Sequence, residues 1–333
     1  MDMRLEGRRS SGSGRLRRWA VNRLPWLAGA AVLGASLPLW QAWVPTGIGR
    51  WLADLAVHWQ WPYALIGVGS AALWLALRAR GERGGAAAML AAALVLAALN
   101  LSWTPLPRLP RAEAAAAVPI KLASFNVHLD NRAFDAIADW ASAEQPDVLA
   151  LVEVTPDMQP LLARLAARYP HTALHARADP FGLAVFSRHP LQGAQLHDDG
   201  RLPPRWRATV KAPGAPFTLT VVHPMPPISA ADRAERDALF DALAQQPAST
   251  RAQVIMGDFN STPWSAGLRR VGDAGWARAT TLQPTFALGR SLPLDHILAT
   301  RAHWRVADAG MGPWLGSDHR PVWALLHAVR ADP

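Results

Sequence analysis

Six short β-rich runs in the C-terminal two thirds of the chain begin or end with uncommon polar side chains. In chain order these are Asn126, Glu153, His223, Asp258 with Asn260, Asp295, and Asp318 with His319. In α/β folds, ligand sites gather at one edge of the strands, so we expect these side chains to share one pocket. Carboxylate and amide oxygens suit a hard cation such as Mg²⁺, which also binds waters and substrate phosphate oxygens. The pattern therefore predicts metal-assisted hydrolysis.

The same residues suggest which side chains hold the metal. We expect Glu153, with Asn126 and Asp318, to supply its oxygen ligands. The absence of an HExxH run and of any Cys argues against a zinc peptidase. A GxSxG elbow and a phosphate-binding Walker loop are also absent from the sequence, which disfavours a serine hydrolase and an NTPase.

The elements that must position these residues follow from the hydropathy pattern. From Ile120 onward, short β-rich runs alternate with amphipathic stretches, which predicts an α/β domain. We expect strands at 120–127, 148–154, 183–187, 217–223, 253–258, 295–298 and 321–326. We expect helices at 133–143, 157–168, 230–244 and 265–274.

The order of short motifs between Ile120 and Leu326 resembles the endonuclease/exonuclease/phosphatase superfamily. The motifs are SFNV, LVEV, GLAVFSRHP, VVHP, GDFNSTP, LDHIL and GSDHRPV, of which GDFN and GSDHRPV together are the most specific. This superfamily includes pancreatic deoxyribonuclease, abasic-site endonucleases, inositol polyphosphate phosphatases and neutral sphingomyelinases. The resemblance implies a four-layered α/β sandwich that hydrolyses a phosphoester with a divalent metal, Mg²⁺ or alternatively Mn²⁺ or Ca²⁺.

The resemblance also implies roles for the site residues. Glu153 matches the principal metal ligand, Asn126 lies beside it, and Asp318 matches a second acidic group near the metal. Asp258 would orient or deprotonate the attacking water, and Asn260 would hold Asp258 and the phosphate. His319, paired with Asp295, would bind the phosphate and polarise its bond. His223 would protonate the leaving oxygen, because a histidine is suited to donate a proton near neutral pH.

The sequence departs from the family pattern in three ways. Val152 stands where the family often has Gln before the metal-binding Glu. The carboxylate that partners the mid-domain His in deoxyribonuclease has no convincing counterpart, and Asp179 is the nearest candidate. The domain is also short for the insertions that grip DNA, which weakens a nuclease assignment more than a general phosphoester hydrolase assignment.

Other polar residues have structural explanations. His296 alternates with Asp295 along a strand, so we expect it to point to the opposite face. We expect Arg320 to support its loop, and we expect scaffold or surface positions for His128, His189 and His327. Three arginines could steer an anionic substrate or simply line a solvated face: Arg188, Arg233 and Arg236.

The N-terminal third contains three stretches without Asp, Glu, Lys or Arg: Leu24–Gly49, Leu55–Leu77 and Gly84–Pro107. Each is long enough to cross a hydrocarbon core of about 30 Å. Nine of the 16 Trp fall between Trp19 and Trp103, several near the ends of these stretches, as in an interfacial belt. We therefore expect three transmembrane helices, with the second starting near Trp61, rather than buried helices of a soluble domain or a cleaved signal sequence.

Charge sets the expected orientation. Residues 1–117 hold 13 Arg against 5 acidic residues, whereas the rest of the chain is nearly neutral, so the net charge of +9 does not indicate that the C-terminal domain binds a polyanion. Arginines concentrate before the first stretch and between the second and third, which predicts a cytoplasmic N-terminus. The expected domains are a basic cytoplasmic tail (1–23), three transmembrane helices (24–104), a linker (105–119) and an extracytoplasmic hydrolase domain (120–333), held in the inner or cell membrane.

Three functional hypotheses remain open from the sequence. The leading one is a membrane-anchored phosphodiesterase or endonuclease that acts on nucleic acid. The second is a phosphoesterase that acts on a lipid headgroup or an inositol phosphate. The third is a catalytically silent membrane-bound binding or scaffold protein, which the presence of the full set of site residues disfavours. No organic cofactor and no protein partner is predicted.

Overall fold

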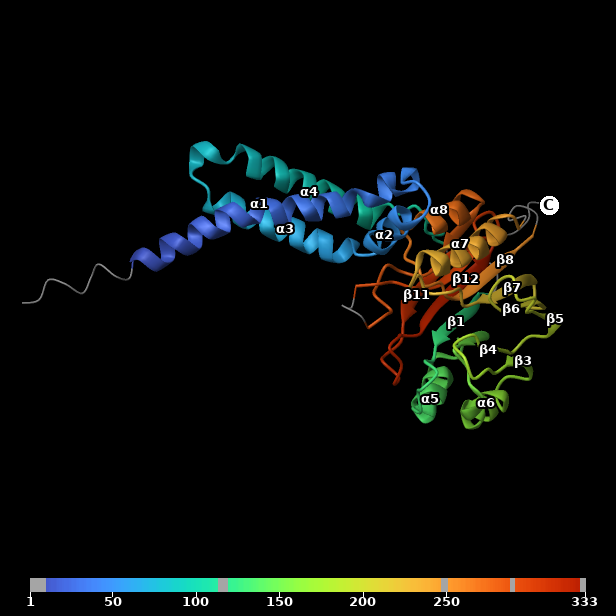
Figure 1. Cartoon of the computed structure of the whole chain (residues 1–333). Coiled ribbons are helices and arrows are strands. Elements are labelled where there is room, and N and C mark those ends of the chain that lie inside the picture. Colours follow the sequence, from blue (N-terminus) through green and yellow to red (C-terminus); the bar gives the residue numbers. More distant parts are fainter. Residues whose placement is uncertain (1–9, 113–118, 247–250, 288–290, 330–333) are drawn as a thin grey trace, which may run out of the picture. The chain divides into compact units, whose positions relative to one another are not determined.

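The computed structural model describes residues 10–112, 119–246, 251–287 and 291–329 (Figure 1). The chain divides into two compact units. The first, here called the helical unit, comprises Met1–Pro45 and Leu52–Thr104. The second, here called the α/β unit, comprises Thr46–Trp51 and Pro105–Pro333.

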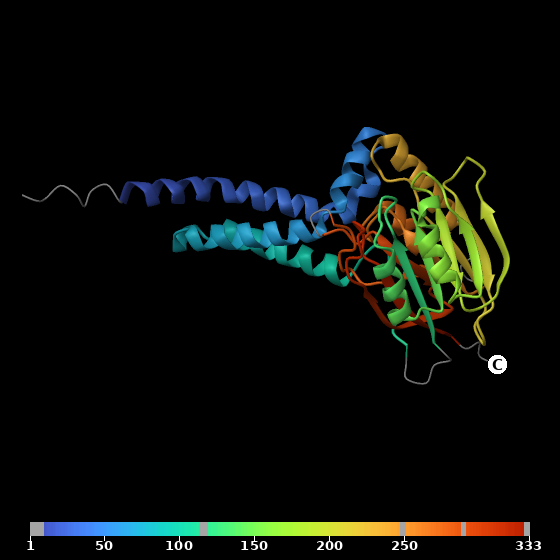
Figure 2. The same ribbon diagram turned by 90° about the horizontal axis from the view of Figure 1, so that it is seen from below.

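Three long helices make the helical unit: α1 (Ser10–Trp40), α3 (Gln60–Leu77) and α4 (Gly84–Ser102). They lie side by side in two views of the chain (Figures 1 and 2). Small residues line their contacts, since a Cβ added to Gly67 would lie 3.4 Å from Ala31 and 3.5 Å from Ala93. Large apolar side chains are instead exposed on the outer faces, among them Leu27, Leu33, Leu65, Leu73, Leu94 and Val95. Small residues inside and apolar residues outside are typical of helices that pack within a bilayer.

Two buried amides link the three long helices. The Asn100 side chain on α4 donates to the Ala35 carbonyl at 2.8 Å and to Gln60 Oε1 at 2.6 Å. Gln60 Nε2 in turn donates to the Val57 carbonyl at 2.9 Å. Interhelical amide hydrogen bonds of this kind fix helix register in an apolar surrounding.

The three predicted transmembrane helices are not confirmed by the structure. Among the described residues, one helix, Gly84–Ser102, has the length and the mean hydropathy (2.0) needed to cross a membrane. The first predicted stretch is interrupted, because α1 ends at Trp40 and is followed by a 3₁₀ turn (Gln41–Trp43) and by α2 (Ile48–Val57). The second is broken after Val57, and α3 begins at Gln60, one residue before the expected start. A three-helix membrane segment therefore stays a prediction.

The α/β unit contains two six-stranded sheets. One has the strand order β11-β12-β1-β2-β4-β3 and the other β5-β6-β7-β8-β10-β9. The strands are β1 (Ile120–Asn126), β2 (Val148–Val152), β3 (His171–His175), β4 (Leu183–Ser187), β5 (Leu191–His197), β6 (Arg205–Val210), β7 (Phe217–Val222), β8 (Gln253–Asp258), β9 (Trp276–Arg278), β10 (Asp295–Thr300), β11 (Trp304–Met311) and β12 (Val322–Ala328). The β1–β2 and β7–β8 pairs are parallel and all other pairs are antiparallel.

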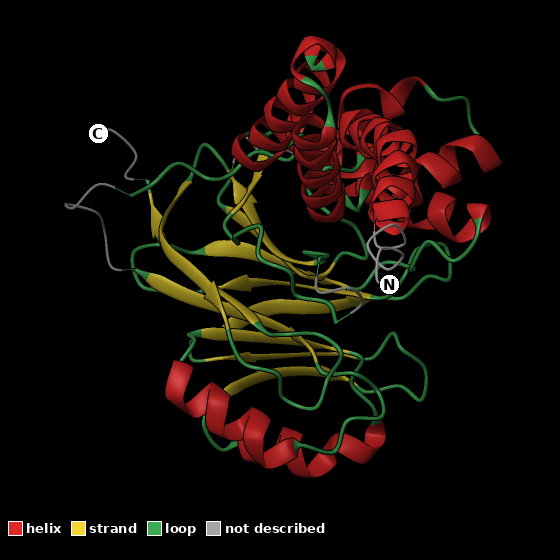
Figure 3. Cartoon of the chain, turned by 90° about the vertical axis from the view of Figure 1, so that its left-hand side faces the viewer, coloured by secondary structure: helices red, strands yellow, loops and turns green. Residues whose placement is uncertain are grey.

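Helices cover the outer face of each sheet (Figure 3). The first sheet carries α5 (Phe134–Glu144) and α6 (Gln159–Ala166), which follows a short 3₁₀ turn (Pro156–Met158). The second carries α7 (Ala230–Ala244) and α8 (Ala266–Asp273). A separate apolar core fills the space between the two sheets. This arrangement confirms the predicted four-layered α/β sandwich.

Residues 105–112 of the predicted linker belong to the α/β unit, and two of their apolar side chains are buried in it. Leu106 is fully buried, and its backbone N–H donates to the Pro263 carbonyl at 3.1 Å. Leu109 is also buried, and its N–H donates to the Arg278 carbonyl at 2.9 Å. The apolar residues between the prolines thus pack as part of the fold rather than forming a free tether. Residues 113–118 of the predicted linker lie outside the described residues.

Gly257 lies at the closest approach of two strands. Its φ is +149°, and a Cβ at this position would collide with the Val222 carbonyl of the neighbouring β7. Only glycine combines this backbone conformation with so close a contact. Because Gly257 immediately precedes Asp258, the same contact sets where the Asp258 carboxylate emerges from the sheet.

We expect Gly257→Ala to destabilise the protein by ~2 kcal/mol or more, since both the backbone strain and the collision must be relieved. Chemical denaturation of the purified protein, followed by tryptophan fluorescence, measures this loss. Gly193→Ala is the matched control, because Gly193 also has a positive φ (+63°) but open space around it. The free energy of unfolding of the control should fall by only about 1 kcal/mol. Equal decreases in the two variants would contradict the collision.

Candidate active site

Sheet topology brings the predicted site residues to one edge. In the first sheet, β1 ends at Asn126, and its parallel neighbour β2 ends just before Glu153. In the second sheet, β7 ends just before His223, and its parallel neighbour β8 ends at Asp258. Strand β10 runs antiparallel to β8, so its first residue, Asp295, is in register opposite Asp258. The two sheets therefore place side chains from strands far apart in sequence around a common centre, as the sequence predicted.

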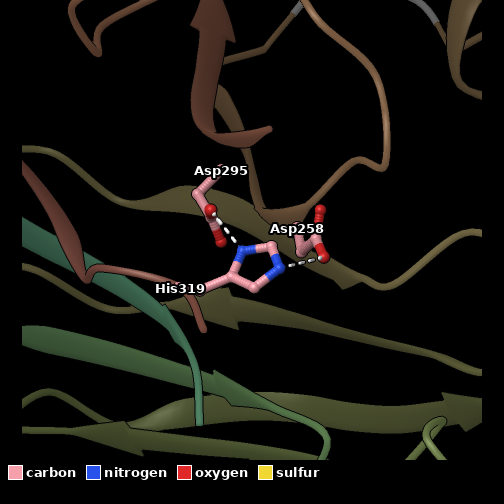
Figure 4. A group of neighbouring side chains, drawn as sticks. All are labelled: Asp258, Asp295 and His319. Atoms are coloured by element: carbon pink, nitrogen blue, oxygen red, sulfur yellow. Dashed lines mark hydrogen bonds and ion pairs between the residues drawn. The ribbon is translucent and has the colours of Figure 1, made fainter. Parts of the chain in front are cut away.

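The His319 imidazole lies between two buried carboxylates (Figure 4). Its Nδ1 lies 2.7 Å from Asp295 Oδ2, and its Nε2 lies 3.6 Å from Asp258 Oδ2. Burial alone would lower the pKa of His319, but the Asp295 and Asp258 carboxylates raise it to about 10. The ring is therefore protonated at neutral pH. The same three residues, Asp258, Asp295 and His319, present ligand atoms within 4.8 Å of one another, so they form a group that could hold a metal ion.

Asp258 receives hydrogen bonds from both sides of the site. The Asn260 backbone N–H donates to its Oδ1 at 2.8 Å, and the Asn126 side-chain amide donates to its Oδ2 at 3.1 Å. Burial raises the pKa of Asp258, but the opposing effects of His319, His223 and the Asn260 N–H outweigh it and leave that pKa well below its usual range. Asp258 is thus an ionised carboxylate that accepts hydrogen bonds.

Glu153 occupies a strained backbone position directly after β2. Its φ is +61°, a conformation that long side chains rarely adopt. The Asn126 side-chain amide donates to Oε1 at 2.8 Å, and the Leu129 backbone N–H donates to Oε2 at 3.2 Å. Backbone strain that the surroundings enforce is typical of functional residues. It aims a partly exposed carboxylate, 15% accessible, into the site.

The other two predicted metal ligands are placed differently. Asn126 Oδ1 accepts the His128 backbone N–H at 3.0 Å, while its Nδ2 faces the carboxylates of Glu153 and Asp258. In this arrangement Asn126 ties the two carboxylates together instead of offering an oxygen to a metal. Asp318 is half-buried beside His319, and its charge contributes to the raised pKa of that ring. Metal ligation by Asn126 and Asp318 stays a prediction.

His223 enters the site from the end of β7. Its Nδ1 lies 2.9 Å from the Pro180 carbonyl, and its Nε2 lies 3.3 Å from Asn260 Nδ2 and 3.6 Å from Asp258 Oδ2. Burial lowers the pKa of His223, but the Asp258 and Glu153 carboxylates and the Pro180 carbonyl raise it above its ordinary value overall. Asn260, at a φ of +45°, also donates to the Pro224 carbonyl at 3.0 Å, which fixes its amide beside the ring.

The donor set suits a divalent cation. Three carboxylates, Glu153, Asp258 and Asp295, converge on a site in which His319 is the fixed positive charge. Asp295 Oδ1 is buried without a hydrogen-bond partner among the described residues, and burial raises the pKa of Asp295. Glu153 is the most accessible carboxylate of the three, which makes it the residue best placed to hold a metal.

Several supporting residues were not predicted. Ser317 Oγ donates to the Asn126 carbonyl at 2.7 Å and accepts the His319 N–H at 2.9 Å, so it joins β1 to the His319 loop. Thr285 Oγ1 accepts the backbone N–H of Asp295 at 3.2 Å. The position of Ser317 inside GSDHRPV was a signal that could have identified it. Nothing in the local sequence marks Thr285, because its contact depends on a distant loop.

The expectation that Arg233 and Arg236 steer substrate or line a solvated face was wrong. Both are buried in the described structure, and both contact Asp237, at 2.6 Å and 3.1 Å. Arg236 also donates to the Asn260 carbonyl at 3.0 Å, so it supports the segment that carries Asn260. Helical spacing alone did not reveal that this helix face packs inward. Arg188 is exposed, and it lies 3.6 Å from Asp147.

Two structural interpretations are confirmed. His296 is fully buried, and its Nε2 lies 3.0 Å from the Ser261 carbonyl, on the opposite face of β10 from Asp295. Arg320 donates to the Gly312 carbonyl at 2.7 Å and so supports its own loop. His128 contributes to the site through its backbone N–H, which binds Asn126.

Comparisons with known proteins agree with this geometry. A model of the endonuclease/exonuclease/phosphatase family matches residues 123–319, more than half of the chain. A search of curated proteins found no match.

Solved structures share the fold of the α/β unit. An endonuclease/exonuclease/phosphatase from Beutenbergia cavernae is 20% identical with a TM-score of 0.52, covering 64% of this chain and 72% of its own. D. rerio TDP2 complexed with single-strand DNA product is 16% identical, with a TM-score of 0.52. The match covers 63% of this chain and 100% of the TDP2 chain. The 3′ phosphatase NExo from Neisseria, bound to a product DNA hairpin, is 18% identical, with a TM-score of 0.51. The match covers 62% of this chain and 98% of the NExo chain.

The buried His296 should make stability depend on pH. Burial lowers its pKa to about 4, whereas the unfolded residue titrates near 6.5. Its contribution is therefore present above pH 6.5 and is lost as pH falls towards 4, by roughly 3 kcal/mol in total. Denaturation curves with EDTA at pH 7.5 and 5 should show a larger loss on acidification for the wild type than for His296→Gln. Equal losses would contradict a neutral buried ring.

Proposed function

Because the chain belongs to the endonuclease/exonuclease/phosphatase family and is a phosphoester hydrolase, we propose that it is a divalent-metal-dependent phosphodiesterase anchored in a membrane. The observation that carries this proposal is the convergence of Glu153, Asp258 and two histidines at one sheet edge. A silent binding protein would have no physical need for a buried, partly unsatisfied charge cluster, which is costly to maintain.

Glu153 would hold the metal, with Asn126 fixing the orientation of its carboxylate through the 2.8 Å hydrogen bond. A bound divalent cation would neutralise phosphate charge and polarise the phosphorus–oxygen bond. Asp318, from the neighbouring loop, is the second acidic residue that we propose near the metal. Mg²⁺ is the first ion to test because oxygen ligands dominate the site, and Mn²⁺ and Ca²⁺ are the alternatives.

Asp258 would accept a hydrogen bond from the attacking water and align it with the phosphorus. Its pKa is far below neutral, so it is a weak base and its main contribution is orientation. The Asn260 N–H and the Asn126 amide hold both of its oxygens, which fixes the direction from which the water approaches.

The two histidines would act at the phosphate. His319 carries a positive charge at neutral pH, so it stabilises the negative charge that develops on the phosphoryl oxygens. His223 presents Nε2 to the site, beside Asn260 and Asp258, and would donate a proton from this nitrogen to the leaving oxygen.

A nucleic acid phosphodiester is the proposed substrate. D. rerio TDP2 and Neisseria NExo, which share the fold, have been solved with DNA products. The remaining candidate is a lipid-headgroup or inositol phosphoester, which the same cluster could hydrolyse because both substrates present a phosphate oxygen to it.

The exposed apolar faces of α1, α3 and α4 support a membrane anchor. Arginines lie before α1's apolar part and between α3 and α4, which favours a cytoplasmic location for both segments. We therefore place the N-terminus in the cytoplasm and the hydrolase domain outside it, with the helices in the inner or cell membrane.

The full chain in nanodiscs should hydrolyse a phosphodiester only with a divalent metal. Supercoiled plasmid, single-stranded DNA, a chromogenic phosphodiester and phospholipid vesicles are assayed with EDTA or Mg²⁺. Asp258→Asn should lower the Mg²⁺-dependent rate by at least about 100-fold, because the water is no longer held by a charged acceptor. Asp139→Asn, an exposed change on α5, is the control.

Each arm of this assay has a distinct meaning. Nicking of plasmid lost in Asp258→Asn supports the nuclease proposal, whereas turnover of lipid alone moves the substrate to a headgroup phosphoester. An absence of hydrolysis with Mg²⁺, Mn²⁺ and Ca²⁺ would refute the metal-dependent mechanism.

Topology is tested with reporters. An alkaline phosphatase fused to the C-terminus should be active in cells, since this enzyme needs an oxidising compartment, and the same reporter inserted at Gly81 should be inactive. The reverse pattern would overturn the proposed orientation.

A further inference from the structure

On its Nδ1 side, the His223 ring is held by a backbone carbonyl rather than by a carboxylate. Its Nδ1 lies 2.9 Å from the Pro180 oxygen. A carbonyl oxygen can only accept, so this contact requires a proton on Nδ1. The remaining nitrogen, Nε2, is then directed towards Asp258 and Asn260. The hydrogen bond to the Pro180 carbonyl thus orients the ring so that Nε2 faces the site.

The turn that presents this carbonyl is fixed by Asp179 and Arg177. Asp179 Oδ1 accepts the Phe181 backbone N–H at 3.0 Å, so its side chain closes the turn around Pro180. The Arg177 guanidinium binds the same carboxylate with a fork of two nitrogens, Nε at 2.8 Å and Nη2 at 2.5 Å. A bidentate pair of this type fixes orientation as well as distance.

The same turn is joined to Val154, the residue directly after Glu153. The Arg177 N–H donates to the Val154 carbonyl at 3.0 Å, and the Val154 N–H donates to the Gly182 carbonyl at 3.0 Å. A Cβ on Gly182 would collide with that Val154 carbonyl, so the two segments cannot approach as closely with any other residue. The turn is therefore anchored at both ends.

Two further contacts limit its movement. Arg177 Nη1 donates to Asp198 Oδ2 at 3.1 Å, which ties the turn to the segment after β5. The Phe181 ring packs against the His223 ring, with centroids 5.8 Å apart. The imidazole is held along its edge by Pro180 and across its face by Phe181.

We propose that Arg177 and Asp179 are positioning residues for His223. They hold the Pro180 carbonyl where it accepts from Nδ1, and the ring therefore presents Nε2 to the leaving oxygen of the substrate. Neither side chain touches substrate. This inference rests on the proposed role of His223 as proton donor, and Asp179 acts through the backbone of the next residue instead of by direct contact with the imidazole.

The kinetic test uses phosphodiesters that differ only in the leaving group. With a poor leaving group such as an alkyl alcohol, Asp179→Asn and Arg177→Gln should lower kcat by about 10- to 100-fold with little change in KM. With p-nitrophenol, which leaves without protonation, the loss should be under about 3-fold. His223→Gln should show the same dependence, and adding Asp179→Asn to it should cause no further loss. Arg177→Lys, which keeps the charge but not the fork, should be only partly active.

The control is Asp135→Asn, which removes another exposed Arg–Asp ion pair, Arg164–Asp135, between α5 and α6. It should leave all substrates unaffected. An equal loss of kcat for every leaving group in Asp179→Asn, or an additive loss in the double variant, would show a general structural effect and overturn the inference.

A spectroscopic measurement separates this inference from the proposed function. In ¹⁵N-histidine-labelled protein, the His223 Nδ1–H signal, assigned by its absence in His223→Gln, should be protected from solvent exchange. Asp179→Asn should abolish that protection, and Asp135→Asn should not. If no phosphodiester is hydrolysed but protection behaves as expected, the positioning role holds and the phosphodiesterase proposal fails. Retained protection in Asp179→Asn would overturn the positioning role whatever the activity.

Discussion

Repulsion between buried carboxylates is the constraint that the rest of this site must offset. Asp258 and Asp295 face each other across adjacent strands, and both are almost completely buried. Two like charges in a medium of low polarity would repel strongly. The His319 imidazolium lies between them, and the Asn126 and Asn260 donors together with the histidines keep the pKa of Asp258 below its usual range, whereas burial raises the pKa of Asp295. The two sheets hold this arrangement, because its residues come from strands and loops of both sheets.

Rigid strands allow unfavourable local conformations to persist. Glu153 and Asn260 both have a positive φ. Glu153 immediately follows β2 and Asn260 lies two residues after the end of β8, and both strands are buried along their whole length. Each such residue costs of order 1–3 kcal/mol, which the surrounding core supplies. The apolar layers on both sides of each sheet thus contribute to function, since they keep two strained residues aimed at one centre.

The sequence predicted the central strands and the common edge because apolar runs that end in polar residues are a strong local signal. Strands Leu183–Ser187 and Gln253–Asp258 and helix Ala230–Ala244 agree with the expected bounds. Strands β3, β5, β6, β9 and β11 were missed, and β5 shows why: it is largely exposed, so its hydropathy resembles that of a loop. Contacts that depend on distant segments, such as Pro180 with His223 or Arg236 with Asn260, leave no local pattern.

The burial of Leu106 has a consequence for the order of folding. This residue packs in the core beneath the second sheet, and its N–H binds the Pro263 carbonyl. The ribosome adds Pro263 roughly 8–30 s later, at about 5–20 residues per second. The apolar segment after α4 therefore emerges long before its partners exist. The α/β unit can close this core only late in synthesis, and until then Leu106 and Leu109 are exposed apolar side chains that a chaperone or another nascent chain could bind.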